Sequence, residues 1–420
     1  MKRTFILIFA LGILFAMIGY ATELTFWTAP NANQEHFWKD VLKEWSATHP
    51  NIEIKWSVIP AAGSSEEAIL TAISTGKAPD ICTNIFSGFA AQLIDASVIV
   101  PFDSFPDFKQ LLQTRKMENA IKGWEYNKHY YVLPLYSNPN LVWWRKDLLK
   151  KYGFDRAPRT YDDIYALSRA CVIPHKRYSY QFVKGRNWWD RWFDFITHYY
   201  AASGGKAYID TRRNKAAFKN EYGEAVAEFL YTLFKNKWTA VDLGTDPFYN
   251  GTVLGMTNGP WELLRAKQAY PEIYKDKILL APPPVPSNYS KDKPIYTFAD
   301  TKGMVLFKKC KDKKAAWEFI KWVFTNVDHD KLWLEYTNMP PVREDLLTNP
   351  IFTAYFAKNL YAAKYAEYVP YAVPPALTDK TIDVQDAMTE SLIEPLMYLK
   401  STPEKALKDA VKKINDILWE

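Results

Sequence analysis

The sequence contains little cysteine and little glycine for its length, and its excess of charge is small. Three cysteines and 16 glycines occur in 420 residues, and the formal net charge is +6. Cys82, Cys171 and Cys310 are far apart and in no C-x-x-C spacing, which speaks against a disulfide scaffold and a cysteine metal or redox motif. We expect buried, inert thiols, with one long-range disulfide as the alternative. The positive charge is spread along the chain, so we expect no nucleic-acid partner.

Motifs of common enzyme classes are also missing. The chain has no G-x-S-x-G, no H-E-x-x-H, no Walker loop and no G-x-G-x-x-G after a strand. Its six histidines are dispersed, which argues against a metal cluster. We therefore expect a protein that is not an enzyme and that holds neither a cofactor nor a metal ion.

Aromatic residues, in contrast, are abundant. The chain has 16 Trp, 27 Tyr and 24 Phe, and 48% of its residues are hydrophobic. At about 150 residues per domain, a chain of this length should bury two or three domain-sized cores. Trp and Tyr combine an apolar face with a polar edge, so they suit either a core or a ligand.

The N-terminus has the pattern of an export signal. Lys2 and Arg3 precede an apolar run from Phe5 to Ile18, and Gly19-Tyr20-Ala21 follows. This order predicts a cleavable signal peptide over residues 1–21. The run is short for a membrane-spanning helix, which needs about 20 residues, although an uncleaved anchor stays the alternative. No cysteine near the cut could carry a lipid, so we expect a soluble periplasmic or secreted protein.

Strand and helix patterns then alternate. Residues 24–27 and 52–58 read as strands, a helix capped by Asn31 or Asn33 covers 35–48, and a further helix precedes a strand that starts at Pro79. This β-α-β-α-β order predicts a mostly parallel sheet covered by helices. Later helices are expected after Thr160, over 312–325 and from Thr402 to the C-terminus, and the proline-rich residues 281–286 should form an extended connection.

A series of short motifs matches one family in order along nearly the whole chain. The matching segments are Leu24-Thr25-Phe26-Trp27, His49-Pro50-Asn51-Ile52, Gly76-Lys77-Ala78-Pro79-Asp80-Ile81, Leu133-Pro134, Trp143-Trp144-Arg145-Lys146-Asp147-Leu148, Pro158-Arg159-Thr160-Tyr161-Asp162-Asp163, Asn258-Gly259-Pro260-Trp261, Ala315-Ala316-Trp317-Glu318-Phe319-Ile320 and Met339-Pro340-Pro341-Val342-Arg343. The chain resembles the extracellular solute-binding proteins of ABC importers, in the group that includes maltose and oligosaccharide receptors.

The resemblance implies an α/β, two-lobed periplasmic-binding-protein fold with three hinge crossings and the ligand in the interlobe cleft. Lobe one would comprise residues 23–136 plus 299–342, and lobe two residues 139–296 plus 346–420. The hinges would lie near Tyr136–Pro139, Tyr296–Asp300 and Pro341–Asp345. The implied function is that of a monomeric receptor that captures a carbohydrate and delivers it to the membrane permease subunits of an ABC importer. Closure of two sheet edges over one ligand would signal occupancy.

A sugar site needs aromatic platforms together with fixed donors and acceptors. Some candidates follow the first strand, and others lie where the resemblance places ligand contacts, with the family's stacking Trp at position 261. Arg343 is equally well explained by a structural salt bridge. The candidate residues are Trp27, Asn31, Asn84, Phe86, Ser87, Asn138, Gly259, Trp261 and Arg343.

A cluster of tryptophans provides a further hypothesis. Trp188, Trp189 and Trp192 lie within five residues and are flanked by charges, so they cannot all face one side of a helix. An exposed member would be a sugar platform, and packing in the core of lobe two is the alternative for Trp188 and Trp192.

Two other functions stay open. A secreted glycoside hydrolase would use two carboxylates across the scissile bond, for which Glu262 and Glu335 could serve. A discontinuous two-lobe pattern does not suit a repeating barrel. A receptor for a non-sugar solute such as a phosphate ester would need clustered cations, and Arg186, Arg191 and Arg343 are candidates for that role.

Overall fold

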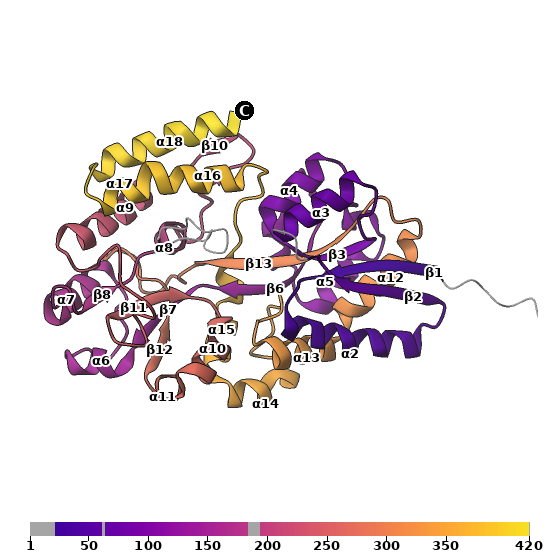
Figure 1. The fold of residues 1–420 in the computed structure, drawn as a ribbon, viewed down its shortest axis with the longest axis horizontal. Helices are drawn as coiled ribbons and strands as arrows, with labels where there is room; N and C mark the ends of the chain where they lie inside the picture. The colour runs from indigo at the N-terminus through magenta and orange to yellow at the C-terminus, as the bar shows by residue number, and fades with distance from the viewer. Residues whose placement is uncertain (1–21, 61–63, 184–193, 420) are drawn as a thin grey trace, which may run out of the picture.

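The computed structural model describes residues 22–60, 64–183 and 194–419 as helices, strands and connecting loops. Its elements form two parts that lie side by side in Figure 1, with strands β6 and β13 running from one part to the other. Among the residues that the structure describes, none of the helices combines the length and apolar character that crossing a membrane would require.

The first part is built on the N-terminal strands. β1 pairs in parallel with both β2 and β3, which confirms the parallel sheet predicted from the β-α-β-α-β order. Helices from the same stretch of chain pack around this sheet. The elements are β1 (Thr22–Thr28), α2 (Ala32–Thr48), β2 (Ile52–Val58), α3 (Ser65–Ser74), β3 (Ile81–Ile85), α4 (Ser87–Asp95), η1 (Phe102–Ser104), α5 (Phe108–Arg115), η2 (Ala120–Trp124), β4 (Glu125–Tyr126) and β5 (His129–Tyr130).

Two long strands connect the parts. β6 (Leu133–Pro139) and β13 (Thr297–Leu306) pair antiparallel, with Asn138 opposite Asp300 and Ser137 opposite Thr301. A third segment joins them, because the Ser137 amide donates to the Pro340 carbonyl at 2.9 Å and the Val342 amide donates to the Leu135 carbonyl at 3.1 Å. The three crossings of the fold class therefore lie against one another.

The second part contains a four-stranded sheet in the order β12-β7-β11-β8. β7 is antiparallel to β11 and β12, and β8 is parallel to β11. The elements are β7 (Leu141–Arg145), α6 (Lys146–Lys151), α7 (Tyr161–Cys171), β8 (Tyr178–Tyr180), α8 (Asp194–Ser203), β9 (Ile209–Asp210), β10 (Lys215–Ala216), α9 (Glu221–Lys235), β11 (Val253–Asn258), α10 (Glu262–Ala269), α11 (Pro271–Tyr274) and β12 (Ile278–Ala281).

The chain after β13 returns to both parts. α12 and α13 pack with the first part (Figure 1). In the second part, α17 and α18 pack on α9, and α16 packs on α18. The elements are α12 (Lys313–Thr325), α13 (Val327–Thr337), α14 (Pro350–Lys358), α15 (Leu360–Ala366), η3 (Val369–Tyr371), β14 (Ala372–Val373), α16 (Thr381–Met388), the π-helical segment η4 (Thr389–Ile393), α17 (Glu394–Met397) and α18 (Pro403–Trp419).

Each part has its own apolar core. One core joins residues 24–136 with 304–342, and another joins 142–298 with 384–418. Leu377, which the sequence analysis assigns to lobe two, packs in the first core. The exact limits of lobe one and lobe two stay a prediction. The three cysteines are buried and free, as expected of inert thiols.

Side-chain caps explain where several helices begin. Asn31 accepts from the Gln34 amide at the start of α2, and Asp312 accepts from the Ala315 amide at the start of α12. Thr160 and Asp163 form a reciprocal capping box before α7. Because these side chains satisfy amides that lack a helical partner, local sequence determines the helix start.

Candidate functional site

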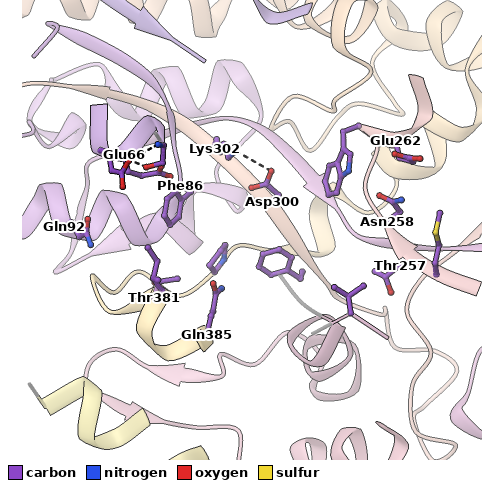
Figure 2. A pocket seen from close by; sticks show the side chains of 18 of the residues that line it. Glu66, Phe86, Gln92, Thr257, Asn258, Glu262, Asp300, Lys302, Thr381 and Gln385 are labelled. Atoms are coloured by element: carbon purple, nitrogen blue, oxygen red, sulfur yellow. Dashed lines mark hydrogen bonds and ion pairs between the residues drawn. The ribbon is translucent and has the colours of Figure 1, made fainter. Parts of the chain in front are cut away.

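A cavity of about 1110 Å³ lies between the two parts of the molecule (Figure 2). Its walls come from six separate stretches of the chain. The lining residues are Ser64, Glu66, Glu67, Leu70, Phe86 and Gln92 of the first part, Phe298, Asp300 and Lys302 of β13, Gln181, Val183, Met256, Thr257, Asn258, Trp261 and Glu262 of the second part, and Pro375, Thr381, Ile382 and Gln385 near α16.

The wall of the first part is made by chain segments that follow strands. The Ser64 side chain accepts a hydrogen bond from the Glu67 amide, and the Glu67 side chain accepts one from the Ser64 amide. This capping box fixes the first turn of α3, and Glu66 and Glu67 of that turn line the cavity. Phe86 lies between β3 and α4, where the strand ends and the helix begins. This wall is the carboxyl edge of the parallel strands, at which open α/β sheets usually bind ligands.

The floor is formed by one face of β13. Phe298, Asp300 and Lys302 all line the cavity, and their spacing of two places them on the same side of the strand. The Lys302 ammonium lies 3.9 Å from the Asp300 carboxylate (Figure 2). Asp300 raises the pKa of Lys302 against the opposing effect of burial, so this side chain stays charged at neutral pH.

The wall of the second part presents an exposed indole. Trp261 follows β11 and is 36% exposed, a large fraction for an indole that lines a cavity. A Cβ atom at position 259 would stand only 1.9 Å from the Trp261 ring, so the ring lies directly against the Gly259 backbone. The glycine therefore allows the close approach that orients the ring.

A network of polar and aromatic groups supports Glu262 beside this ring. Glu262 Oε1 accepts from the Tyr249 hydroxyl at 2.6 Å and from Arg265 at 2.8 Å. Arg265 also pairs with Asp246 at 2.7 Å, and Tyr249 stacks on Tyr270 with ring centroids 3.9 Å apart. These contacts fix the first turn of α10, and they give Glu262 a bracing role.

Buried polar side chains of the second part hold Thr257 in position. Its hydroxyl lies 2.8 Å from the Tyr180 hydroxyl, which in turn lies 3.2 Å from His198 Nε2. Burial lowers the pKa of His198 to about 3, so the imidazole is neutral at physiological pH. The chain of uncharged groups fixes the orientation of the Thr257 side chain at the cavity wall.

Two of the residues proposed from sequence, Phe86 and Trp261, line the cavity from opposite walls. Asn84 donates to the Ser65 hydroxyl at 3.1 Å and thus braces the start of α3. Ser87 and Asn138 are buried behind the surface, with 0% and 2% exposure. Together with Gly259, these residues support the walls without lining them.

Three other proposed residues lie elsewhere. Trp27 is half-buried against the first core, and Asn31 caps α2. Arg343 is 3% exposed and pairs with Asp330 at 3.0 Å and Asp345 at 2.8 Å. Its guanidinium is engaged by these carboxylates, so the geometry supports the structural salt bridge rather than a ligand contact. Trp188, Trp189 and Trp192 lie outside the described residues.

Several cavity residues were not proposed from the sequence. Glu66 and Glu67 follow a strand end and a capping box, so the rule that found Phe86 could have found them. Asp300 and Lys302 lie in or beside a predicted hinge, where only the pairing of β13 reveals which side chains face the cavity. Gln385 belongs to α16, for which the sequence analysis made no prediction.

Comparisons with known proteins place the chain in a family. The model of the bacterial extracellular solute-binding proteins matches residues 30–328. A maltotriose-binding protein of Pyrococcus abyssi is 25% identical over 407 residues, which cover 92% of this chain and 82% of the relative.

Solved structures agree with this family in fold. An uncharacterized protein of Listeria monocytogenes has a TM-score of 0.88 and 34% identity, and the match covers 94% of this chain and 100% of that one. A cyclic α-maltosyl-1,6-maltose binding protein of Arthrobacter globiformis has a TM-score of 0.80 at 18% identity, with 94% and 99% covered. The chain belongs to the family of bacterial extracellular solute-binding proteins.

Proposed function

We propose that the protein captures a carbohydrate in the cavity between its two lobes and delivers it to the permease of an ABC importer. The observation that carries this proposal is the pairing of an exposed Trp261 ring with Phe86 on the opposite wall, among carboxylates and carboxamides. Sugar rings present apolar C–H faces and a rim of hydroxyls. Aromatic faces and fixed hydrogen-bonding groups are complementary to those two surfaces.

The size of the cavity favours an oligosaccharide. Small-molecule pockets usually have volumes of about 300–1000 Å³, and this one has about 1110 Å³. The maltotriose-binding and cyclic α-maltosyl-1,6-maltose binding proteins are named for ligands of several sugar units. We infer a ligand of more than one sugar unit.

The charge of the walls disfavours an anionic ligand. Among the described lining residues, Glu66, Glu67, Glu262 and Asp300 carry carboxylates, whereas Lys302 alone carries an ammonium group. A phosphate ester needs clustered cations. Arg343 is engaged elsewhere, and Arg186 and Arg191 lie outside the described residues.

Delivery would depend on hinge closure. The three paired crossings connect the predicted lobes, so we expect the bending to occur there. A ligand that contacts both walls would stabilise the closed form. We propose that the receptor acts as a monomer outside the cytoplasm, after cleavage of the signal peptide predicted over residues 1–21.

A thermal-shift screen of sugars tests the proposal. A ligand at 100 times its Kd stabilises the state it binds by about 2.7 kcal/mol, so one or more oligosaccharides should raise the Tm clearly. The same sugars should change the intrinsic tryptophan fluorescence, because Trp261 lines the cavity. Sugar phosphates in the same screen provide the comparison. A panel in which only sugar phosphates raised the Tm would contradict the carbohydrate proposal.

Incubation with labelled oligosaccharides separates a receptor from a hydrolase. We expect the sugar to be recovered intact after prolonged incubation with purified protein. Glu262 is already engaged by Tyr249 and Arg265, which suits bracing better than proton transfer. Products that accumulated in excess over the protein would show catalysis and would refute the receptor function.

Replacing Gly259 by alanine should reduce sugar affinity by displacing the indole. The new Cβ would stand 1.9 Å from the Trp261 ring, which therefore has to move. We expect roughly a tenfold increase in Kd, measured by titration calorimetry, because the displaced ring no longer stacks fully on the sugar. This change corresponds to about 1.4 kcal/mol of binding free energy. The matched control is Gly259→Ala in a Trp261→Ala background, where the clash is gone and the effect should vanish. An equal loss in both backgrounds would contradict this explanation.

A further inference from the structure

The helix α16 forms a wall of the cavity that no sequence motif indicated. Thr381 and Gln385, four residues apart and thus on one face of the helix, both line the cavity. Val384, Ala387 and Met388 point the other way into the core of the second part. In Figure 2, Gln385 lies near Thr381 at one end of the cavity, and Thr257 and Asn258 lie at the other end. The position of Gln385 is therefore set by packing.

The carboxamide of Gln385 differs from the other polar groups of the cavity. Its side chain is 1% exposed, and its Oε1 atom has no hydrogen-bond partner among the described residues. Of the described residues that line the cavity, it is the one whose side chain carries such a buried, unpartnered atom. Burial of an unpaired acceptor lowers stability, so an unpaired acceptor on a residue that lines a cavity is a candidate ligand contact.

The neighbouring groups are engaged with the protein itself. The Thr381 hydroxyl donates to the Thr378 carbonyl at 2.7 Å. Gln92 Nε2 reaches the Asp379 carbonyl at 3.4 Å, and a Cβ at Gly88 would stand 2.7 Å from Thr381, so α4 of the first part lies directly against the start of α16. These contacts hold α16 in place across the cleft, and none of them engages Gln385 Oε1.

We propose that Gln385 Oε1 accepts a hydrogen bond from a hydroxyl of the sugar bound in the cavity, and that it thereby contributes to specificity. This assignment rests on the proposed function, because it requires a ligand rich in hydroxyl donors. A ligand with a hydroxyl at this place binds more tightly, because it pairs the buried acceptor. A ligand with an apolar group at the same place leaves the acceptor unpaired and binds less tightly. Gln385 thus improves sugar binding at the cost of stability in the ligand-free protein.

The variant Gln385→Met tests both effects, because methionine has nearly the same length and shape without the amide. We expect the Kd for the sugar selected by the screen to rise roughly three- to tenfold, in line with the loss of one neutral hydrogen bond. The Tm of the ligand-free protein should rise, by about 2–4 °C, because the unpaired acceptor is removed. A residue with a purely structural hydrogen bond would lower the Tm on the same change.

The matched control is Gln113→Met on the exposed surface of α5, which should alter neither quantity. An unchanged Kd for Gln385→Met, or a weaker Kd together with a lower ligand-free Tm, would overturn the assignment while the wild type still bound the sugar. A wild type that bound no sugar in the screen would overturn the proposed function and this assignment with it.

Discussion

Replacing Trp261 by alanine is expected to weaken carbohydrate binding by roughly ten- to a hundredfold. Among the described residues of the second part, Trp261 is the exposed aromatic residue that lines the cavity. A central tryptophan commonly contributes about 2 kcal/mol or more to a binding interface. Because the ring is 36% exposed in the ligand-free structure, we expect the free energy of unfolding to change by about 1 kcal/mol at most. Titration calorimetry and thermal unfolding measure the two quantities separately.

Trp419→Ala is the matched control for this variant. Trp419 is the last residue of α18, is 69% exposed and does not line the cavity. The control should retain wild-type affinity and should keep the ligand-induced part of the fluorescence change, which the Trp261 variant should lose. Wild-type affinity of the Trp261 variant for every sugar that binds would refute the platform role.

Replacing Asp330 by asparagine is expected to produce the largest loss of stability. The Asp330 carboxylate lies 2.9 Å from Arg115 and 3.0 Å from Arg343, and all three side chains are nearly inaccessible to solvent. Removal of one partner from a buried ion pair leaves an uncompensated charge, at a cost of about 3–5 kcal/mol. At about 2–4 °C per kcal/mol, the Tm should fall by roughly 10 °C.

The loss of stability in the Asp330 variant should also affect the crossings between the lobes. Arg115 donates to the carbonyls of Leu135 and Val342, which belong to β6 and to the third crossing segment. It also lies over the Phe324 ring, with 4.5 Å from its guanidinium carbon to the ring centroid. The ion network therefore anchors the base of the hinge, and we expect the variant to lose resistance to proteolysis near residues 133–139.

Asp328→Asn on the same helix separates the network from a general effect of charge. Asp328 is exposed in the first turn of α13, where its interaction with the helix dipole is worth about 0.3–1 kcal/mol. The control should therefore lower the Tm only slightly. Equal losses in the two variants, measured by denaturant unfolding, would show that the buried network is not responsible.

Much of the fold could be predicted because its determinants are local. Asn31 and Thr160 cap helices as predicted, and the helix predicted over 312–325 corresponds to α12, which Asp312 caps. The alternation in residues 52–58 corresponds to β2. Neighbouring side chains satisfy the first amides of a helix, and the period of apolar residues selects strand or helix. Such signals are contained within a few residues.

The candidate site could be predicted only in part. Phe86 and Trp261 were found because they follow strand ends or match a motif of the family. Asn31 and Arg343 have the same kinds of polar side chains as a sugar site, but they are engaged in a cap and in an ion network. Residue type alone cannot distinguish these uses, because both rest on the same hydrogen bonds.

From the sequence alone, the β-α-β-α-β unit, several later helices and the family could be predicted, and Phe86 and Trp261 were among the candidate site residues. The arrangement in three dimensions was needed to show that Asp300 and Lys302 form the floor and that Gln385 of α16 completes the wall. The antiparallel pairing of β13 with β6 selects the face that Asp300 presents, and packing against the second core selects the face of α16. The pairing of β6 with β13 joins residues more than 100 positions apart, and α16 packs mainly on η4 and α18. Neither contact is contained in a local sequence pattern.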